Sequence, residues 1–234
     1  MHKVGVAPDI VDRVEKRRGR RHIYDRVTPA KTALVVIDMQ NTFMAEGAPA
    51  EVPVAREIVP NINRLAAALR RAGGTVVWIQ MTLAPGDTDS WSRFFGEVNS
   101  AERSKRMFEG LSEGNEGWQF WPTLDVQKSD LVVRKNRYSC FLPGSSDLPA
   151  LLEARGIDTV LITGTLTNVC CESSARDAMM RNFKVAMVSD ANAALTDRDH
   201  QAALTSIYFA FGDVLTTEEV LAGLETGAAR SAAE

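Results

Sequence analysis

Residues 32–37 read TALVVI, an almost continuous apolar run rich in β-branched side chains that ends at Asp38. This pattern is typical of a strand buried on both faces of a sheet. From residue 54 to 71, apolar side chains instead recur every three or four residues, which predicts an amphipathic helix that the glycine pair at 73–74 ends. Residues 75–80, TVVWIQ, repeat the strand pattern. A strand, a helix and a second buried strand in this order predict a parallel sheet covered by helices.

The alternation continues toward the C-terminus after one interruption. Residues 81–122 lose the pattern and hold seven of the 16 aromatic side chains, which is typical of a lid or pocket wall. Further strands are predicted at 130–134, 159–163, 184–189 and 213–215, and further helices at 147–155, 168–181, 196–211 and from 217 onward. Right-handed crossovers then give a three-layer α/β/α, Rossmann-like fold with a mainly parallel six-stranded sheet.

The composition is that of one compact domain. The chain has 234 residues, of which 45% are hydrophobic and 24% charged, which excludes collagen-like and disordered classes. No apolar run approaches the ~20 residues of a membrane helix, and the N-terminus lacks the apolar core of a signal peptide. We therefore expect a cytoplasmic protein with no membrane partner. Its three cysteines, two of them adjacent, suit neither disulfides nor a redox pair, so we expect reduced thiols.

Charge is distributed unevenly along the chain. Residues 1–31 hold nine Lys and Arg against four Asp and Glu, whereas the remainder holds 18 against 26. We divide the chain into a basic N-terminal arm (1–30), an α/β domain (31–222) and a C-terminal tail (223–234) that we expect to be frayed from 227. A basic arm can bind nucleic acid, but this one has little aromatic interleaving and belongs to an acidic chain. We expect no nucleic-acid partner, and an arm that lies on the body of the protein or on a neighbouring subunit.

In a sheet of this kind, ligands bind at the carboxyl ends of the strands. The residues predicted to lie there are Asp38, Gln80, Lys135, the segment 164–170 and Asp190. A carboxylate, an ammonium group and a thiol can therefore meet in one crevice.

Cys170 is a candidate nucleophile. It falls in the first turn of a predicted helix opened by Thr167 and Asn168, where unpaired backbone N–H groups and the helix dipole favour the thiolate. Asp38 can accept its proton, and Lys135 can keep that carboxylate ionised. Each residue also has a structural interpretation, because a buried cysteine packs as a small apolar residue, an aspartate after a strand caps a helix, and a lone lysine is solvated. Spacing alone leaves both interpretations open.

Four segments carry these residues in a distinctive order. They are VVIDMQNTF (35–43), KNRYSCF (135–141), TGTLTNVCCESSARDAM (163–179) and VSDANAA (188–194). Together they resemble the signatures of the isochorismatase-like cysteine hydrolases, and most of all those of the ureidoacrylate and N-carbamoyl amidohydrolase type. The resemblance covers about 31–222 and implies a hydrolase domain with Asp38, Lys135 and Cys170 as catalytic residues. It also implies a cis peptide bond at Thr165–Leu166 and an oxyanion hole made by the backbone N–H groups of Leu166 and Cys170.

Two departures from the family pattern bear on the chemistry. The family usually has a small aliphatic residue after the nucleophile, and here that residue is Cys171, which we interpret as part of the core; Cys140 is left unassigned. The segment IQMTLAPGDTDSW (79–91) lacks the histidine of the nicotinamidase metal site. The resemblance therefore implies no metal and no other cofactor, and it disfavours nicotinamide as substrate. The cysteine favours hydrolysis of a C–N bond.

The implied function is that of a cysteine-dependent amidohydrolase. It would cleave a small linear carbamoyl, ureido or carboxamide compound through a covalent acyl-enzyme and release ammonia or an amine. The alternatives are another amide of the same chemistry, maleamate-like or nicotinamide-like, and a non-catalytic ligand-binding or thiol-sensing protein. The resemblance also implies a homo-oligomer, either a dimer or a tetramer.

Candidate substrate contacts are Gln80, Trp91, Tyr138 and Asn168. Tyr138 packed under the lid and Asn168 capping its helix are equally acceptable interpretations. Arg137 can pair with a substrate carboxylate or form an outward ion pair.

Overall fold

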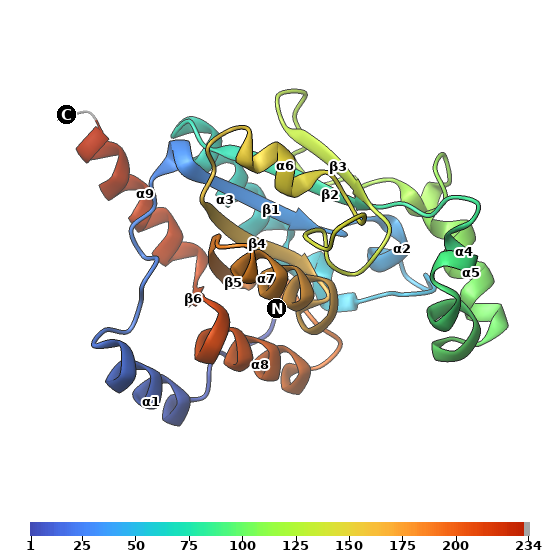
Figure 1. Ribbon diagram of the computed structural model, residues 1–234, viewed down its shortest axis with the longest axis horizontal. Helices are drawn as coiled ribbons and strands as arrows, with labels where there is room; N and C mark the ends of the chain where they lie inside the picture. Colours follow the sequence, from blue (N-terminus) through green and yellow to red (C-terminus); the bar gives the residue numbers. More distant parts are fainter. Residues whose placement is uncertain (232–234) are drawn as a thin grey trace.

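Six strands of the described chain form one all-parallel sheet (Figure 1). The computed structural model describes residues 1–231, with side chains through 225. The strands are β1 (Thr32–Ile37), β2 (Thr75–Met81), β3 (Leu131–Lys135), β4 (Thr159–Thr165), β5 (Lys184–Ala193) and β6 (Asp213–Leu215). Their order, β3-β2-β1-β4-β5-β6, confirms the predicted fold class. The order reverses between β1 and β4, and ligands bind to such sheets at the carboxyl ends of the strands beside this switch point.

Helices cover both faces of the sheet. They are α1 (Pro8–Arg18), α2 (Asn41–Met44), α3 (Val59–Arg71), α4 (Asp87–Ser90), α5 (Ala101–Leu111), α6 (Leu148–Glu153), α7 (Glu172–Met180), α8 (Asp197–Ser206) and α9 (Thr217–Ser231). Side chains of β1 alternate between two apolar cores: Leu34 and Val36 pack with α3 and α9, whereas Val35 and Ile37 pack with α1, α6, α7 and α8.

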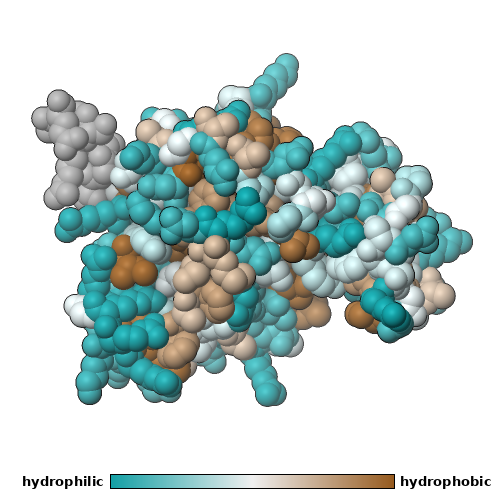
Figure 2. Space-filling view, in the orientation of Figure 1, coloured by the Kyte–Doolittle hydropathy of each residue, from teal (hydrophilic) through white to brown (hydrophobic). Residues whose placement is uncertain are grey.

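The outer surface is mostly polar on the face drawn in Figure 2, where apolar residues lie in small separate patches. Within residues 1–231, none of the helices is long and apolar enough to cross a membrane.

Two predicted helices begin differently from the sequence pattern. The helix expected at 54–71 starts as a 3-10 turn, η2 (Pro53–Ile58), and becomes α3 only at Val59. Pro60 explains the break, because proline lacks the N–H that a continuous helix would need there but suits the first turn of a new one. The helix expected at 168–181 starts as a π turn, η5 (Thr167–Cys171), which leads into α7.

The C-terminal helix covers part of the expected tail. Leu224 packs in the apolar core, and α9 continues past it as far as Ser231. The tail expected from 223 is therefore helical up to that point, and residues 232–234 lie outside the described residues.

The basic arm folds back on the body through α1, a helix that the sequence analysis missed. Val14 of α1 is fully buried in the core that includes the π turn η6 (Ile207–Phe211). The guanidinium groups of Arg17 and Arg18 donate hydrogen bonds to the carbonyls of Phe209 and Tyr208. The basic side chains thus satisfy the carbonyl ends of a π turn, and the arm lies on the body of its own chain.

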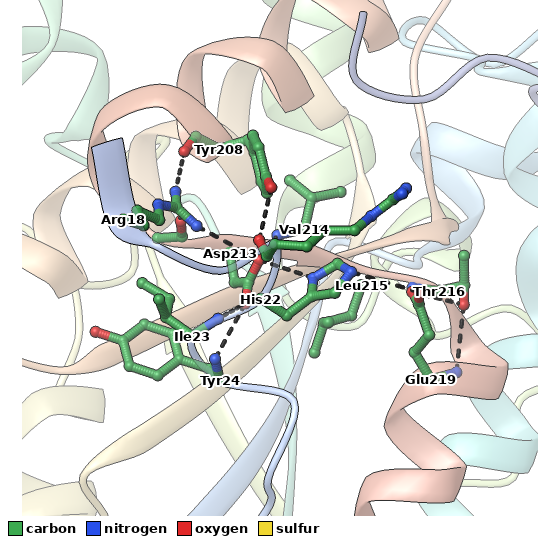
Figure 3. A network of polar contacts seen from close by, with 12 residues as sticks. Arg18, His22, Ile23, Tyr24, Tyr208, Asp213, Val214, Leu215, Thr216 and Glu219 are labelled. Carbon is green, nitrogen blue, oxygen red and sulfur yellow. Dashed lines mark hydrogen bonds and ion pairs between the residues drawn. The ribbon is translucent and has the colours of Figure 1, made fainter. Parts of the chain in front are cut away.

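A second attachment of the arm centres on Asp213, which is fully buried in β6 (Figure 3). Its carboxylate accepts hydrogen bonds from the backbone N–H groups of Ile23 at 2.6 Å and Tyr24 at 3.0 Å. His22 Nδ1 lies 3.1 Å from the same group and Arg18 Nη1 lies 3.8 Å from it. A single buried carboxylate therefore holds the segment that joins α1 to β1.

Candidate active site

The carboxyl ends of β1, β3 and β4 bring a carboxylate, an ammonium group and a thiol to one point. Asp38 follows β1 directly, Cys170 lies in the turn after the adjacent β4, and Lys135 is the last residue of β3. The lysine reaches past Met81, its register partner on β2, with Nζ 3.5 Å from the Met81 sulfur. The sequence analysis predicted this meeting from the strand ends, and the structure brings the three residues together.

The side chains of Asp38, Lys135 and Cys170 lie close together and are shielded from solvent. Lys135 Nζ lies 2.7 Å from Asp38 Oδ2 and 3.7 Å from Cys170 Sγ, and it donates to the Arg137 carbonyl at 3.0 Å. Asp38 is fully buried and Cys170 is 4% exposed. The Cys170 thiol is the second polar neighbour of the Asp38 carboxylate, although it lies outside ordinary hydrogen-bond geometry. Such contacts often tighten only when a substrate binds.

Burial dominates the electrostatics of the cluster. It raises the pKa of the Asp38 carboxyl, and the nearby Lys135 only partly offsets this effect. It also raises the pKa of the Cys170 thiol, again against the pull of Lys135. Burial works in the opposite direction on Lys135, but the charges of Asp38 and Cys170 raise the pKa of its ammonium overall. The sequence analysis expected the helix terminus to favour the thiolate; in the folded chain, burial keeps the thiol protonated and leaves Asp38 as a stronger proton acceptor.

A glycine with positive φ lets the two central strands meet at this point. Gly164 has a φ of +112° and pairs with Ile37 across β1 and β4. A Cβ at this position would lie 2.1 Å from the Ile37 carbonyl oxygen, so no other residue fits. The next peptide bond but one, Thr165–Leu166, is cis, as the family resemblance implies.

Two aromatic side chains, Trp91 and Tyr138, line a groove on the surface of the protein. The Trp91 ring stacks on Phe94 with centroids 4.1 Å apart and meets Tyr138 edge to face at 5.0 Å. A groove of about 400 Å³ is lined by both Trp91 and Tyr138 together with Ser173 of α7. Burial raises the pKa of the Tyr138 phenol, and the charge of Cys170 adds to the effect. Two of the four candidate substrate contacts, Trp91 and Tyr138, thus share one groove.

Gln80 and Asp190 are placed differently from the prediction. The Gln80 amide donates to the Trp118 carbonyl at 2.9 Å, and Gln80 lines another groove, at the outer edge of β3. Asp190 accepts hydrogen bonds from the Thr217 backbone at 2.7 Å and from its hydroxyl at 2.8 Å, so it caps α9 instead of facing the crevice. Each of these side chains is hydrogen-bonded to a backbone group far away in the sequence, and the sequence pattern does not reveal such a partner.

The sequence analysis left alternative roles open for Asn168 and Arg137. Asn168 is exposed, and among the described residues no side chain caps the start of η5, so Asn168 is not a helix cap. The Arg137 guanidinium donates to the Ser90 hydroxyl at 3.0 Å and lies over the Trp91 ring. Arg137 therefore contacts the helix α4, and its guanidinium also lies 3.6 Å from Asp87. It lines the same groove as Trp91 and Tyr138, so pairing with a substrate carboxylate stays a prediction.

The sequence analysis missed Gln40, which is fully buried two residues after Asp38. Its amide group donates to the carbonyls of Met81 at 3.0 Å and Trp118 at 2.9 Å and accepts from the Met81 N–H at 2.8 Å. It joins the end of β2 to the lid and to the turn that follows β1. The only signal in the sequence was its place in the segment 35–43.

In the part of the chain that the structure describes, no three His, Cys, Asp or Glu side chains are grouped as metal ligands.

Residues 32–219 match the family model of the isochorismatase domain. The chain belongs to the isochorismatase family. The matched residues of this isochorismatase-family chain include Asp38, Lys135 and Cys170, whereas α1 and His22 precede the match.

Individual relatives agree with this assignment. Ureidoacrylate amidohydrolase RutB from Pseudomonas savastanoi pv. phaseolicola is 32% identical over 207 residues, which cover 83% of this chain and 84% of the relative. The crystal structure of a cysteine hydrolase from Pseudomonas syringae pv. phaseolicola 1448A has a TM-score of 0.77 and 32% identity, covering 86% of this chain and 95% of the other. N-carbamoylsarcosine amidase from Thermoplasma acidophilum has a TM-score of 0.65 and 28% identity, covering 80% and 97%. The resemblance drawn from the four segments is confirmed, and the chain is an isochorismatase-family hydrolase.

Proposed function

We propose that this protein is a cysteine-dependent amidohydrolase that cleaves a C–N bond in a small linear ureido or carboxamide compound. The observation that carries the proposal is the dry cluster in which Lys135 Nζ lies 2.7 Å from Asp38 and 3.7 Å from Cys170. A buried base with a raised pKa beside a protonated thiol is the arrangement that activates a sulfur nucleophile. The names of the relatives, a ureidoacrylate amidohydrolase and an N-carbamoylsarcosine amidase, support the substrate class.

The first half-reaction forms an acyl-enzyme. Asp38 accepts the thiol proton, and Cys170 Sγ attacks the carbonyl carbon of the substrate. The backbone N–H groups of Leu166 and Cys170 donate to the oxygen on which negative charge develops. The C–N bond then breaks, Asp38 returns the proton to the leaving nitrogen, and ammonia or an amine departs from a thioester on Cys170.

The second half-reaction releases the acid. A water molecule gives a proton to Asp38 and attacks the thioester carbon, the C–S bond breaks, and the Cys170 thiolate regains the proton from Asp38. Lys135 stabilises the anionic form of Asp38 between the two transfers, since its ammonium group partly offsets the burial of the carboxylate.

Several finer assignments belong to the same proposal. Trp91, Tyr138 and the exposed Asn168 contact the substrate, and the hydrolase domain covers 31–222 with the arm of 1–30 folded on it. All three cysteines are free, which supports a reducing compartment such as the cytoplasm. The assembly is a homo-oligomer, either a dimer or a tetramer, and no cofactor takes part.

The test combines a substrate panel with detection of the intermediate. Ammonia release is measured for ureidoacrylate, N-carbamoylsarcosine, maleamate and nicotinamide, and intact-mass spectra are recorded after rapid acid quenching. We expect turnover of the linear ureido or amide compounds and an acyl adduct that is absent from Cys170→Ala. Turnover of nicotinamide alone would contradict the proposed class of linear substrates. Normal turnover by Cys170→Ala, or binding of panel compounds with neither ammonia nor adduct, would overturn the mechanism.

A further inference from the structure

A buried histidine lies directly behind the proposed nucleophile turn. His200 of α8 is fully buried, and its Nδ1 lies 2.9 Å from the hydroxyl oxygen of Thr167. Thr167 is the first residue of η5 and follows Leu166. The Leu166 carbonyl in turn accepts the N–H groups of Val169 and Cys171, both at 3.1 Å. The hydroxyl that His200 holds is therefore part of the same turn that presents Leu166 and the proposed nucleophile.

The His200 ring is neutral, and few hydrogen-bond partners are available to its two nitrogens. Burial lowers its pKa to about 4, and the neighbouring His2 contributes in the same direction. Within residues 1–231 no partner in ordinary hydrogen-bond geometry reaches its Nε2. A neutral ring carries one N–H, so one of its nitrogens donates and the other accepts. In the described part of the chain, the Thr167 hydroxyl is thus the one side chain that is hydrogen-bonded to the ring.

His2, the second residue of the chain, packs against the His200 ring. The His2 ring stacks on His200 with centroids 4.2 Å apart and planes inclined by 21°. Its Nδ1 lies 2.6 Å from Asp197 Oδ1 at the start of α8, and its Nε2 accepts the Ala194 N–H at 3.0 Å. The His2 side chain is only 2% exposed, and Figure 1 shows the N-terminus beside α8. His2 is therefore part of the buried surroundings of His200, although it lies outside the matched residues 32–219.

We propose that His200 is a positioning residue for the proposed amide hydrolysis, and that His2 locks it in place, so that the N-terminal segment sets the geometry of the Leu166–Cys170 turn. The proposal rests on the proposed function, in which this turn supplies the nucleophile and two oxyanion donors. Losing one such donor costs about 10²- to 10³-fold in rate, and a displacement of about 1 Å can cost about 10²-fold. A loosened turn should therefore slow the chemical step and leave substrate binding nearly unchanged.

Paired variants of His200 and Thr167 test the contact itself. We expect His200→Leu and Thr167→Val each to lower kcat by about 10- to 100-fold, with KM within about 3-fold. Thr167→Ser keeps the hydroxyl and should stay near wild type, and His200→Asn keeps an acceptor near the position of Nδ1 and should recover part of the loss. The double variant His200→Leu/Thr167→Val should lose no more than the worse single variant, because both changes remove one interaction. Additive losses, or an inactive Thr167→Ser, would contradict the proposal.

Variants of His2 test the lock. His2→Ala should lower kcat by about 3- to 10-fold, and His2→Phe, which keeps the stacking but loses both hydrogen bonds, should fall between it and wild type. Lys3→Ala is the matched control, because Lys3 is exposed and adjacent in the chain. Equal kcat values for His2→Ala and Lys3→Ala would refute the role of the N-terminus.

Amide hydrogen exchange keeps this test independent of the substrate. In His200→Leu and His2→Ala, exchange in the segment 166–171 should be about tenfold faster, while β1 and β4 stay as protected as in wild type. Unchanged exchange in the segment would overturn the inference even where the wild-type protein turns over a substrate. Faster exchange in the two variants, together with a wild-type protein that hydrolyses none of the panel compounds, would retain the positioning role and refute only the proposed function.

Discussion

Lys135 Nζ lies 2.7 Å from Asp38 Oδ2, and both side chains are completely shielded from solvent. Removing one partner of a buried ion pair leaves an uncompensated charge, which costs about 3–5 kcal/mol. We expect Asp38→Asn and Lys135→Met each to lower the free energy of unfolding by this amount, as measured by urea denaturation. Asn suits position 38 because its backbone has a φ of 54°, which asparagine tolerates. The double variant should be more stable than either single variant, and simple addition of the two losses would contradict the pairing.

The same two variants should change the Cys170 thiol in opposite directions. Asp38 raises the pKa of this thiol and Lys135 lowers it. Asp38→Asn should therefore make alkylation by iodoacetamide faster at a given pH, and Lys135→Met should make it slower, while both lose turnover. The measurement is the alkylation rate as a function of pH, with Cys170→Ala as the blank. A shift in the same direction for both variants would rule out the assigned electrostatics.

The three cysteines should differ sharply in reactivity. Cys140 and Cys171 are fully buried, burial raises the pKa of Cys140 to about 12, and Cys171 likewise has a raised pKa. Thiol titration of the native protein should modify only Cys170, and all three thiols should react in denaturant. Cys171→Ala should cost about 1 kcal/mol of stability because it leaves a small cavity, and it should retain most activity. Equal loss of turnover in Cys170→Ala and Cys171→Ala would remove the distinction.

The attachment of the arm should depend on pH through His22 (Figure 3). Its hydrogen bond with Asp213 is the main cause that raises the pKa of His22 in the folded chain. A raised folded pKa stabilises the protein fully below the unfolded value of about 6.5, and this contribution disappears as pH rises through the folded pKa. Wild type should therefore exceed His22→Gln in unfolding free energy by about 1 kcal/mol near pH 5.5, and by less near pH 9. A gap that widens with rising pH would show that the sign is wrong.

The lid aromatics should affect substrate binding more than chemistry. Trp91 stacks on Phe94 and lines the same groove as Tyr138 and Ser173, so Trp91→Leu should raise KM about 10-fold and change kcat by less than about 3-fold. Trp118→Phe is the control, since Trp118 lines the separate groove at the edge of β3. Steady-state kinetics on the best panel compound provide the measurement. An unchanged KM in Trp91→Leu would remove Trp91 from the binding site.

Hydrophobic periodicity predicted the sheet because the spacing of apolar residues along a strand or a helix is a local property of the sequence. The short run 32–37 forms β1, one of the two central strands of the six-stranded sheet, and β6 occupies the predicted residues 213–215. Helix starts were less predictable where one proline, Pro60, outweighed an otherwise helical pattern. Side-chain partners were least predictable, as Gln80 and Asp190 show, because their hydrogen bonds join residues 38 and 27 positions apart.

By itself, the sequence determined the parallel sheet and the strand ends that carry Asp38, Lys135 and Cys170, since residues at the carboxyl ends of parallel strands must share one edge. It also indicated the family, through the four segments 35–43, 135–141, 163–179 and 188–194, and the match of residues 32–219 to the isochorismatase domain confirms it. Only the tertiary structure decided that the pKa of the Cys170 thiol is raised, because burial is a property of the whole fold. It likewise decided that His2 packs on His200 behind Thr167, a contact across 198 positions that no local pattern encodes.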